Sequence, residues 1–280
     1  MKKINIWALS LFCFVSSLSS AHAQDIMKPV QLGLRDAATP QMERISWFHD
    51  HLLLGVITVI VIFVTLLLAW VVFKYNAKSN PIPSKTTHHV MLEVAWTTIP
   101  VIILIIIAIP SFKMLYYLDR VEEPEMTLKV TGYQWYWGYE YQDHEGINFL
   151  SYMIPEEDID ENKGQKRLLS TDNQVVLPID TNIQILVTSA DVIHSFTVPA
   201  FGFKKDAVPG RMNETWVRID KPGVYYGQCS QICGVNHAFM PIEIKAVTKE
   251  EFEQWLIEAK EKFALNNNAP FQIAHYEGVK

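Results

Sequence analysis

Four side chains near the end of the chain are candidate metal ligands, namely Cys229, Cys233, His237 and Met240. A fifth candidate, His194, lies thirty-five residues before the first cysteine. Thiolate, imidazole and thioether groups suit copper, whereas magnesium and calcium take oxygen ligands, and the methionine argues against a purely structural zinc. The ligand types therefore indicate a copper site, and a copper site of this kind indicates electron transfer.

Other interpretations fit part of this set. Cys229 and Cys233 are the only cysteines outside the N-terminal apolar run, and an exported chain with two cysteines ordinarily suggests one disulfide. A zinc site of two Cys and two His leaves Met240 without a role. A mononuclear blue-copper site needs one Cys, two His and an axial Met, and here a second thiolate is present. Two bridging thiolates could instead hold two copper ions that share one electron.

The segment that carries these ligands is expected to be a loop. Gly227, Gly234 and Pro241 disfavour a helix through it, and β-type runs lie on both sides. We expect His194 to come from another loop. Loops on a rigid β scaffold commonly carry such ligands.

A β domain is expected to position these loops. From Glu125 onward the long apolar runs give way to short β-type segments at 126–131, 174–178, 184–188, 215–219, 224–227 and 242–247. Turn pairs such as Pro209-Gly210 and Pro222-Gly223 separate several of them. This pattern predicts an all-β sandwich or barrel. The polar, acidic stretch 143–173 is interpreted as an insertion between strands.

A helix is expected to follow the last strand. Thr248 and Glu251 have the spacing of a capping box, and apolar residues recur at helical intervals as far as Phe263. The tail from Asn266 is expected to be loosely ordered.

Two apolar runs precede the β domain. Leu52–Phe73 has 22 residues without a formal charge, and Val94–Phe112 has 19 more. Each is long enough to cross a bilayer core of about 30 Å, so together they predict a transmembrane hairpin. Pro100 and Pro110 predict a kinked second span that packs in a larger membrane complex.

The charges flanking these runs predict the topology. Lys2 and Lys3, the apolar run after them and the small residues ending at Ala23 indicate a secretory signal peptide that is cleaved before Gln24. Its loss changes the formal charge from −6 to −8, so the mature chain is acidic. The short connector holds three lysines and no acid before Glu93, which places it in the cytoplasm. Both mature termini are then expected outside.

Several motifs in a fixed order resemble subunit II of the haem-copper cytochrome c oxidases, which carries the binuclear copper A centre. Besides the hairpin and the Cys-rich loop, the matching segments are 92–97 (LEVAWT), 134–141 (QWYWGYEY), 191–194 (DVIH) and 205–211 (KDAVPGR). The resemblance covers nearly the whole chain. Together with the sequence features above, it divides the chain into a signal peptide at 1–23, an N-terminal segment and hairpin at 24–118, a β domain at 119–247, and a C-terminal helix and tail at 248–280. The resemblance implies that the β domain is a cupredoxin-like Greek-key copper domain.

The resemblance also implies how the ligands are shared. Cys229 and Cys233 would bridge two copper ions, His194 and Met240 would complete one, and His237 with the main-chain carbonyl of residue 231 would complete the other. The family most often has Glu at that position, and its carboxylate also binds a magnesium or manganese ion shared with subunit I. This chain has Gln231, whose neutral amide is a weaker ligand for a hard cation, which puts that second metal site in doubt.

Further roles follow from the same resemblance. Trp135 would be the residue through which electrons arrive, although aromatic side chains near a membrane are often interfacial or core residues. Glu93 would stand at the entrance of a proton path into subunit I, and an ordinary membrane-edge acid is the alternative. Arg211 would face haem propionates. Three acidic residues are candidates for docking basic cytochrome c, namely Asp206, Glu140 and Asp143. The alternative is that they are ordinary solvated surface charges.

The expected protein is thus the copper A subunit of a cytochrome c oxidase in a bacterial inner membrane, with its copper domain on the periplasmic side. It would pass electrons from cytochrome c to haem in subunit I, where oxygen is reduced to water and protons are pumped. Subunits I and III, cytochrome c and the membrane are the expected partners, and nucleic acid is not. A quinol oxidase subunit would lack the cysteine pair, and a nitrous oxide reductase would be larger and without the hairpin. A structural assembly subunit with a disulfide or zinc remains the rival from another class.

Overall fold

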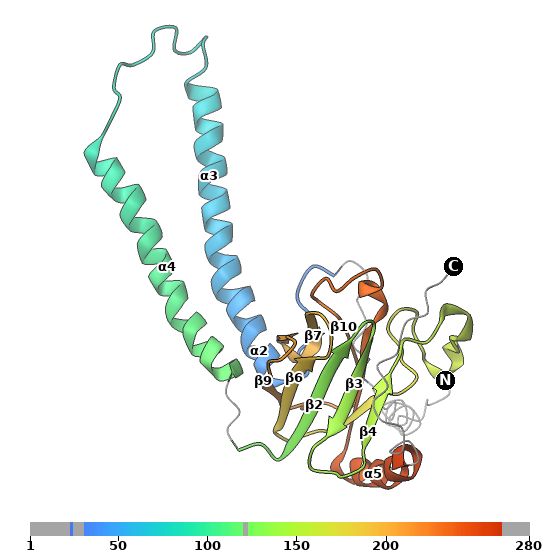
Figure 1. Cartoon of the computed structure of the whole chain (residues 1–280). Coiled ribbons are helices and arrows are strands. Elements are labelled where there is room, and N and C mark those ends of the chain that lie inside the picture. The colour runs from blue at the N-terminus through green and yellow to red at the C-terminus, as the bar shows by residue number, and fades with distance from the viewer. Residues whose placement is uncertain (1–22, 25–30, 120–122, 265–280) are drawn as a thin grey trace, which may run out of the picture.

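The structure is a computed structural model that describes residues 23–24, 31–119 and 123–264. The signal peptide predicted at 1–23, apart from Ala23, and the tail from Asn266 lie outside these residues. Figure 1 shows a long helical hairpin that stands on one end of a β domain. The predicted combination of a membrane hairpin and an all-β domain is confirmed.

The first arm of the hairpin is helical from Pro40 to Lys74. It consists of α2 (Pro40–Trp47), one π-helical stretch η1 (Phe48–Leu53) and α3 (Leu54–Lys74). The second arm is α4 (Val90–Asp119), which continues through Pro100 and Pro110 without a break. Both arms are long and apolar enough to cross a membrane, and α3 and α4 contain no buried residue. Their apolar side chains therefore need lipid or another protein as surroundings.

Two larger sheets and a small ribbon form the β domain. One sheet has the order β4-β3-β2-β6-β9, formed by β2 (Met126–Tyr133), β3 (Tyr136–Tyr141), β4 (Asn148–Ser151), β6 (Ile183–Ser189) and β9 (Asn213–Val217). The other has the order β1-β10-β11-β5, formed by β1 (Ala23–Gln24), β5 (Val175–Pro178), β10 (Gly223–Gln228) and β11 (Pro241–Val247). The ribbon pairs β7 (His194–Val198) with β8 (Phe203–Ala207).

The core lies between these sheets. Strands β2 and β6 alternate buried and half-buried residues, as expected when one face of a sheet is covered. Leu128, Ile185, Phe196 and Ile244 are fully buried there. The six strands that the sequence predicts are present, whereas β1, β3, β4, β7 and β8 were not predicted. The runs of β1, β4 and β8 are short and have little apolar alternation, but the aromatic run of β3 and the alternating Phe196 and Val198 of β7 were strand signals that the sequence analysis missed.

Helix α5 (Lys249–Ala264) covers one end of the domain (Figure 1). The Thr248 hydroxyl accepts a hydrogen bond from the Glu251 backbone N–H, and the Glu251 carboxylate accepts one from the Thr248 N–H. These reciprocal bonds are those of a capping box. Phe252, Leu256 and Phe263 bury the apolar face of the helix against the core.

The β domain is attached to the hairpin on the side of α2. The Thr39 hydroxyl caps α2 and also donates to the Phe201 carbonyl at 2.9 Å. Gly202 has a φ of +76°, and a Cβ at this position would lie 2.9 Å from Cα of Met42. Glycine is therefore required both by its conformation and by the closeness of α2.

A second attachment joins the domain to the end of α4. The Trp216 indole N–H donates to the Tyr117 carbonyl at 2.9 Å. The Arg44 guanidinium of α2 lies 3.7 Å from the centre of the Tyr117 ring, a cation–π contact that ties the two arms together. The domain is thus held against both arms of the hairpin.

We expect Gly202→Ala to loosen the first attachment. The matched control is Gly210→Ala, because Gly210 has a φ of +73° and nothing within 4 Å of a Cβ. Each substitution carries the left-handed penalty of about 1–2 kcal/mol, and only Gly202→Ala also displaces α2. The midpoint of thermal unfolding of the full chain in detergent should fall more for Gly202→Ala. An equal decrease of the unfolding midpoint in the two variants would contradict the close packing of α2 against Gly202.

Candidate metal centre

The ligand loop, residues 229–240, is held at its base by two paired strands. Gln228 at the end of β10 pairs with Pro241 at the start of β11, so the loop leaves and re-enters the same sheet. The four C-terminal ligand candidates lie on this loop, as the sequence predicts. The expectation that His194 lies on a loop is wrong, because His194 is the first residue of strand β7.

A close backbone contact brings β7 beside the ligand loop. A Cβ on Gly227 of β10 would lie only 2.0 Å from the Thr197 carbonyl oxygen of β7, so a larger residue cannot occupy this position without moving a strand. The Ser230 backbone N–H then donates to the Ser195 carbonyl at 3.1 Å. These contacts hold His194 next to Cys229.

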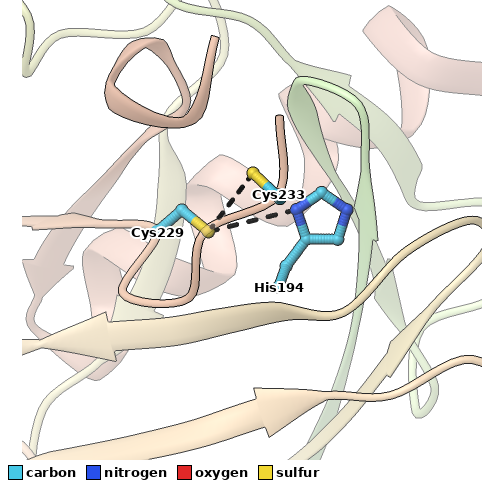
Figure 2. Close-up of side chains that lie close together, drawn as sticks. All are labelled: His194, Cys229 and Cys233. Atoms are coloured by element: carbon cyan, nitrogen blue, oxygen red, sulfur yellow. Dashed lines mark hydrogen bonds between the residues drawn. The ribbon is translucent and has the colours of Figure 1, made fainter. Parts of the chain in front are cut away.

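Figure 2 shows three of the predicted ligands, His194, Cys229 and Cys233, with their donor atoms close together. Cys229 Sγ lies 3.9 Å from Cys233 Sγ and 4.0 Å from His194 Nδ1. Cys233 Sγ lies 3.5 Å from His237 Nδ1 and 3.6 Å from Met240 Sδ. The Gln231 carbonyl oxygen is 3.3 Å from Cys229 Sγ. The donor atoms of His194, Cys229 and Cys233 all lie within 4.8 Å of one another. The donor atoms of Gln231, His237 and Met240 each lie within 3.6 Å of one of the two sulfurs.

These separations fit a metal site better than a disulfide. A disulfide needs its sulfur atoms about 2.05 Å apart, and both cysteines are free. A tetrahedral ion with metal–ligand distances of about 2.0–2.3 Å places neighbouring ligand atoms about 3.3–3.8 Å apart. Three of the observed separations, 3.3–3.6 Å, fall in that range, and the other two, 3.9 and 4.0 Å, lie just above it.

The two thiols are electrostatically unequal. Burial raises the pKa of Cys229, but hydrogen bonds from His194 and nearby backbone groups outweigh it and lower that pKa. Burial, together with repulsion from the Cys229 thiolate, raises the pKa of Cys233. Two buried thiolates this close are thus unfavourable alone, and a cation between them would remove the repulsion.

The His194 imidazole is fully buried and held on three sides. Its Nε2 lies 2.8 Å from Asp191 Oδ1, which leaves Nδ1 facing Cys229. A Cβ on Gly132 of β2 would lie 2.9 Å from the imidazole Cδ2. The edge of Trp137 contacts the ring with centroids 5.9 Å apart. Metal-binding histidines commonly have their second nitrogen fixed in this way.

Trp135 lies against the ligand loop from the turn between β2 and β3. Its indole N–H donates to the Cys233 carbonyl at 3.3 Å, and the Gln134 side-chain amide donates to the same oxygen at 2.8 Å. Gly234 has a φ of +127°, and a Cβ there would lie 2.8 Å from Trp135 Cζ2. The half-buried indole therefore contacts both solvent and the backbone of a predicted ligand.

The acidic docking candidates are spread around the domain. Asp206 of β8 pairs in register with Ser195, next to His194, and its side chain is exposed. Glu140 lies further along β3, where it accepts from Lys129 at 2.9 Å, and this contact lowers its pKa against the opposing effect of burial. Asp143 is exposed and accepts from the Thr127 backbone N–H.

Two predicted residues lie away from the ligands. Glu93 is in the first turn of α4, and α4 rises about 39 Å between Glu93 and Asp119 beside the β domain. Arg211 is exposed in the turn after β8, where it lines an open depression of about 510 Å³ with Lys204 and Lys205. Neither residue belongs to the metal centre.

Three residues of the centre were missed by the sequence analysis. Asp191 forms a hydrogen bond with His194, and the Gln134 side-chain amide donates one to the Cys233 carbonyl. The Trp137 indole N–H donates to the Met240 carbonyl at 3.2 Å. An acid three residues before a candidate metal-binding histidine is the one sequence feature that could have indicated Asp191. Gln134 and Trp137 reach the ligand loop only through the fold.

Comparison with known proteins gives two family matches. Residues 126–247 match the periplasmic domain of cytochrome c oxidase subunit II, and residues 27–114 match its transmembrane domain. A probable cytochrome c oxidase subunit 2 of Rickettsia felis is 49% identical over 263 residues, covering 94% of this chain and 82% of that protein. Cytochrome c oxidase subunit 2 of Branchiostoma floridae is 50% identical over 227 residues, covering 81% and 95%.

Among solved structures, the periplasmic domain of subunit II of cytochrome oxidase from Bradyrhizobium japonicum is 49% identical in sequence. The structural match covers 52% of the present chain and 100% of the solved chain, with a TM-score of 0.48. The two family matches together span most of the described residues, and the two relatives match over 82% and 95% of their own length. The chain is a two-span membrane protein and belongs to the cytochrome c oxidase subunit II family.

Proposed function

We propose that this chain receives electrons from cytochrome c at a binuclear copper A centre and passes them to haem in subunit I of the oxidase. The single observation that carries this proposal is the convergence of two free thiols, two imidazoles, a thioether and a carbonyl oxygen at one place. This donor set fits copper in an electron-transfer site. The chemistry of oxygen reduction lies in subunit I.

The number of donors supports two metal ions rather than one. A single four-coordinate ion would leave two of the six donors unused. If both sulfur atoms are shared, each ion has two thiolates, one imidazole and one weak ligand, and all six donors are used. His194 and Met240 would serve one ion, and His237 with the Gln231 carbonyl the other. Such a pair supplies one-electron transfer with the charge change spread over both ions.

The protein holds four of these donors so that they move little when charge changes, whereas His237 is half-buried and Gln231 is exposed. Cys229, Cys233 and Met240 are buried, and His194 is fully enclosed. Buried, hydrogen-bonded donors have little room to reorganise. Trp135 gives a short covalent and hydrogen-bonded route from the surface to Cys233, and we assign it the role of receiving electrons.

Electrostatics supports a basic donor protein. The acidic side chains of Asp206, Glu140 and Asp143 would steer cytochrome c toward the exposed side of Trp135. Asp206 lies nearest to the ligands, because its strand pairs with the strand that carries His194. It lines the same depression as Lys204, Lys205 and Arg211, whose charges oppose its own. Glu140 is already paired with Lys129, and Asp143 holds a backbone N–H, so their contributions are expected to be smaller.

The arrangement in the membrane follows from the positions of the charges. The connector 75–89 lies at the far end of the hairpin from the β domain (Figure 1). The lysines of this connector favour the cytoplasmic side, so the copper domain at the other end of the hairpin would be periplasmic. The signal peptide would export the mature N-terminus to the same side. We assign Glu93 to the proton-path entrance on the cytoplasmic side. The exposed apolar hairpin would pack against subunits I and III.

Two smaller assignments complete the proposal. Arg211, with two lysines beside it, would face the haem propionates of subunit I. The Gln231 carbonyl faces Cys229 whatever its side chain, so replacing Glu with Gln leaves the copper ligand in place. The neutral amide would bind magnesium or manganese at the subunit I interface only weakly.

The first prediction concerns metal content. The full chain purified in detergent and loaded with copper should bind two copper ions, with an electron-paramagnetic-resonance pattern of one electron shared by two equivalent nuclei. Cys233→Ser should abolish this pattern, because one bridge is lost. Zinc in place of copper, or an oxidised Cys229–Cys233 pair without metal, would instead identify a structural subunit.

The second prediction concerns Trp135. In the assembled oxidase, Trp135→Ala should slow electron transfer from cytochrome c about tenfold or more, equivalent to roughly 1.4 kcal/mol in the barrier. The dissociation constant for cytochrome c should change far less, because the docking acids are untouched. Stopped-flow reduction at saturating donor measures the rate. A rate like that of the unaltered protein would refute the role of Trp135.

The third prediction concerns docking. Asp206→Asn should lower the association rate constant with cytochrome c at low salt, and the difference should shrink as ionic strength rises and screening shortens to about 10 Å at 0.1 M. Asp158→Asn is the matched control, because Asp158 is an exposed acid in the insertion. An association rate that does not change with salt would exclude electrostatic steering.

A further inference from the structure

Asp191 bonds two different parts of the metal centre. Its Oδ1 lies 2.8 Å from His194 Nε2, and its Oδ2 accepts from the Gln134 backbone N–H at 2.7 Å. His194 comes from β7, whereas Gln134 lies in the turn between β2 and β3. One carboxylate therefore joins a predicted ligand to the turn that carries Trp135.

This carboxylate decides which nitrogen of His194 can bind metal. A neutral imidazole has one N–H and one free lone pair. A carboxylate accepts hydrogen bonds, so the proton belongs on Nε2 and the lone pair on Nδ1, which faces Cys229. The opposite tautomer would place a proton between His194 and the metal.

Gln134 continues the connection to the ligand loop. Its side-chain amide donates to the Cys233 carbonyl at 2.8 Å, beside the bond from the Trp135 indole to the same oxygen. A Cβ on Gly234 would lie 3.1 Å from Gln134 Nε2, so the amide rests on the loop backbone. His194, Asp191, Gln134 and Cys233 thus form a chain of contacts that closes through the metal ligands.

We propose that Asp191 and Gln134 are positioning residues that form one clamp. Asp191 selects the metal-binding tautomer of His194, and Gln134 fixes the turn that presses the Trp135 ring onto the ligand loop. The clamp makes the indole and the copper ligands a single rigid unit. The inference rests on the proposed function, because it assigns the two residues roles toward copper and Trp135.

A simple docking role for Asp191 predicts different behaviour. The Asp191 side chain is 31% exposed, so it could act only as another surface acid that attracts cytochrome c. Loss of a docking acid changes the association rate and its salt dependence, and leaves the copper spectrum and affinity unchanged. Loss of a positioning residue changes the copper centre itself.

The test uses the full chain in detergent for copper binding and the assembled oxidase for kinetics. The variants are D191N, D191A and Q134M, with D158N as the matched control for loss of a carboxylate. Q134M keeps the length of the side chain and removes its donor. Copper affinity is measured by competition with a chelator, the spectra by optical absorption and electron paramagnetic resonance, and electron transfer by stopped flow at saturating cytochrome c.

We expect D191A to weaken copper binding about 10- to 100-fold and to alter the spectra. D191N keeps one acceptor oxygen and should recover part of the affinity. Q134M should keep the affinity and spectra of the unaltered chain and slow electron transfer at saturating donor. D158N should match the unaltered chain in every measurement.

Two results would overturn the clamp. The first is that D191N and D191A keep the copper affinity and spectra of the unaltered chain. The only change would then be that a higher concentration of cytochrome c is needed to reach half of the maximal rate. The other is an unchanged rate in Q134M, which is decisive even if D191A does not fold. If the unaltered chain itself bound no copper pair, the proposed function would fail instead, so the two failures are distinguishable.

Discussion

The rest of the β domain depends on holding two sulfur atoms 3.9 Å apart, beside an imidazole, in a buried place. Thiolates at this distance repel each other, and burial makes each charge more costly. Such a cluster is stable only with cations among the donors or with protons that neutralise the sulfurs. The scaffold must therefore keep the donors converged, which it does through backbone contacts rather than through the ligands themselves.

Glycines make this convergence possible. Gly227 lets β10 approach the carbonyl of Thr197 on β7, and Gly132 lets β2 lie against the His194 ring. Gly234 lets Trp135 and Gln134 rest on the ligand loop. At each of these places a side chain would occupy the space of a ligand or its support. The metal centre is thus a product of three strands and a turn that can pack closely.

The same domain is attached firmly to the membrane hairpin. Thr39 and Gly202 join it to α2, and Trp216 joins it to α4. An electron carrier must keep a constant distance to the next acceptor, because transfer slows steeply with distance. Under the proposed function, fixed attachment to both arms would keep the copper centre at one height above the membrane.

Residue types alone were enough to predict the class of the site and the architecture. Soft donors at Cys229, Cys233, His237 and Met240 indicate copper, and two long apolar runs indicate a hairpin, because ligand chemistry and hydrophobic length are local properties. The loop between two strands was predictable from Gly and Pro for the same reason. The family motifs added the pairing of ligands with ions, which spacing cannot provide.

Tertiary structure decided everything that depends on residues far apart in the chain. His194 belongs to a strand rather than a loop, because β7 is fixed by pairing with β8 and by contact with Gly227. Asp191 lies only three residues before the histidine that it holds, whereas Gln134 reaches Asp191 and the ligand loop only after β2, β6 and that loop have packed together. The hydrogen bonds of Gln134 to Asp191 and to Cys233 span 57 and 99 residues of sequence, a separation at which local propensity and periodicity carry no information.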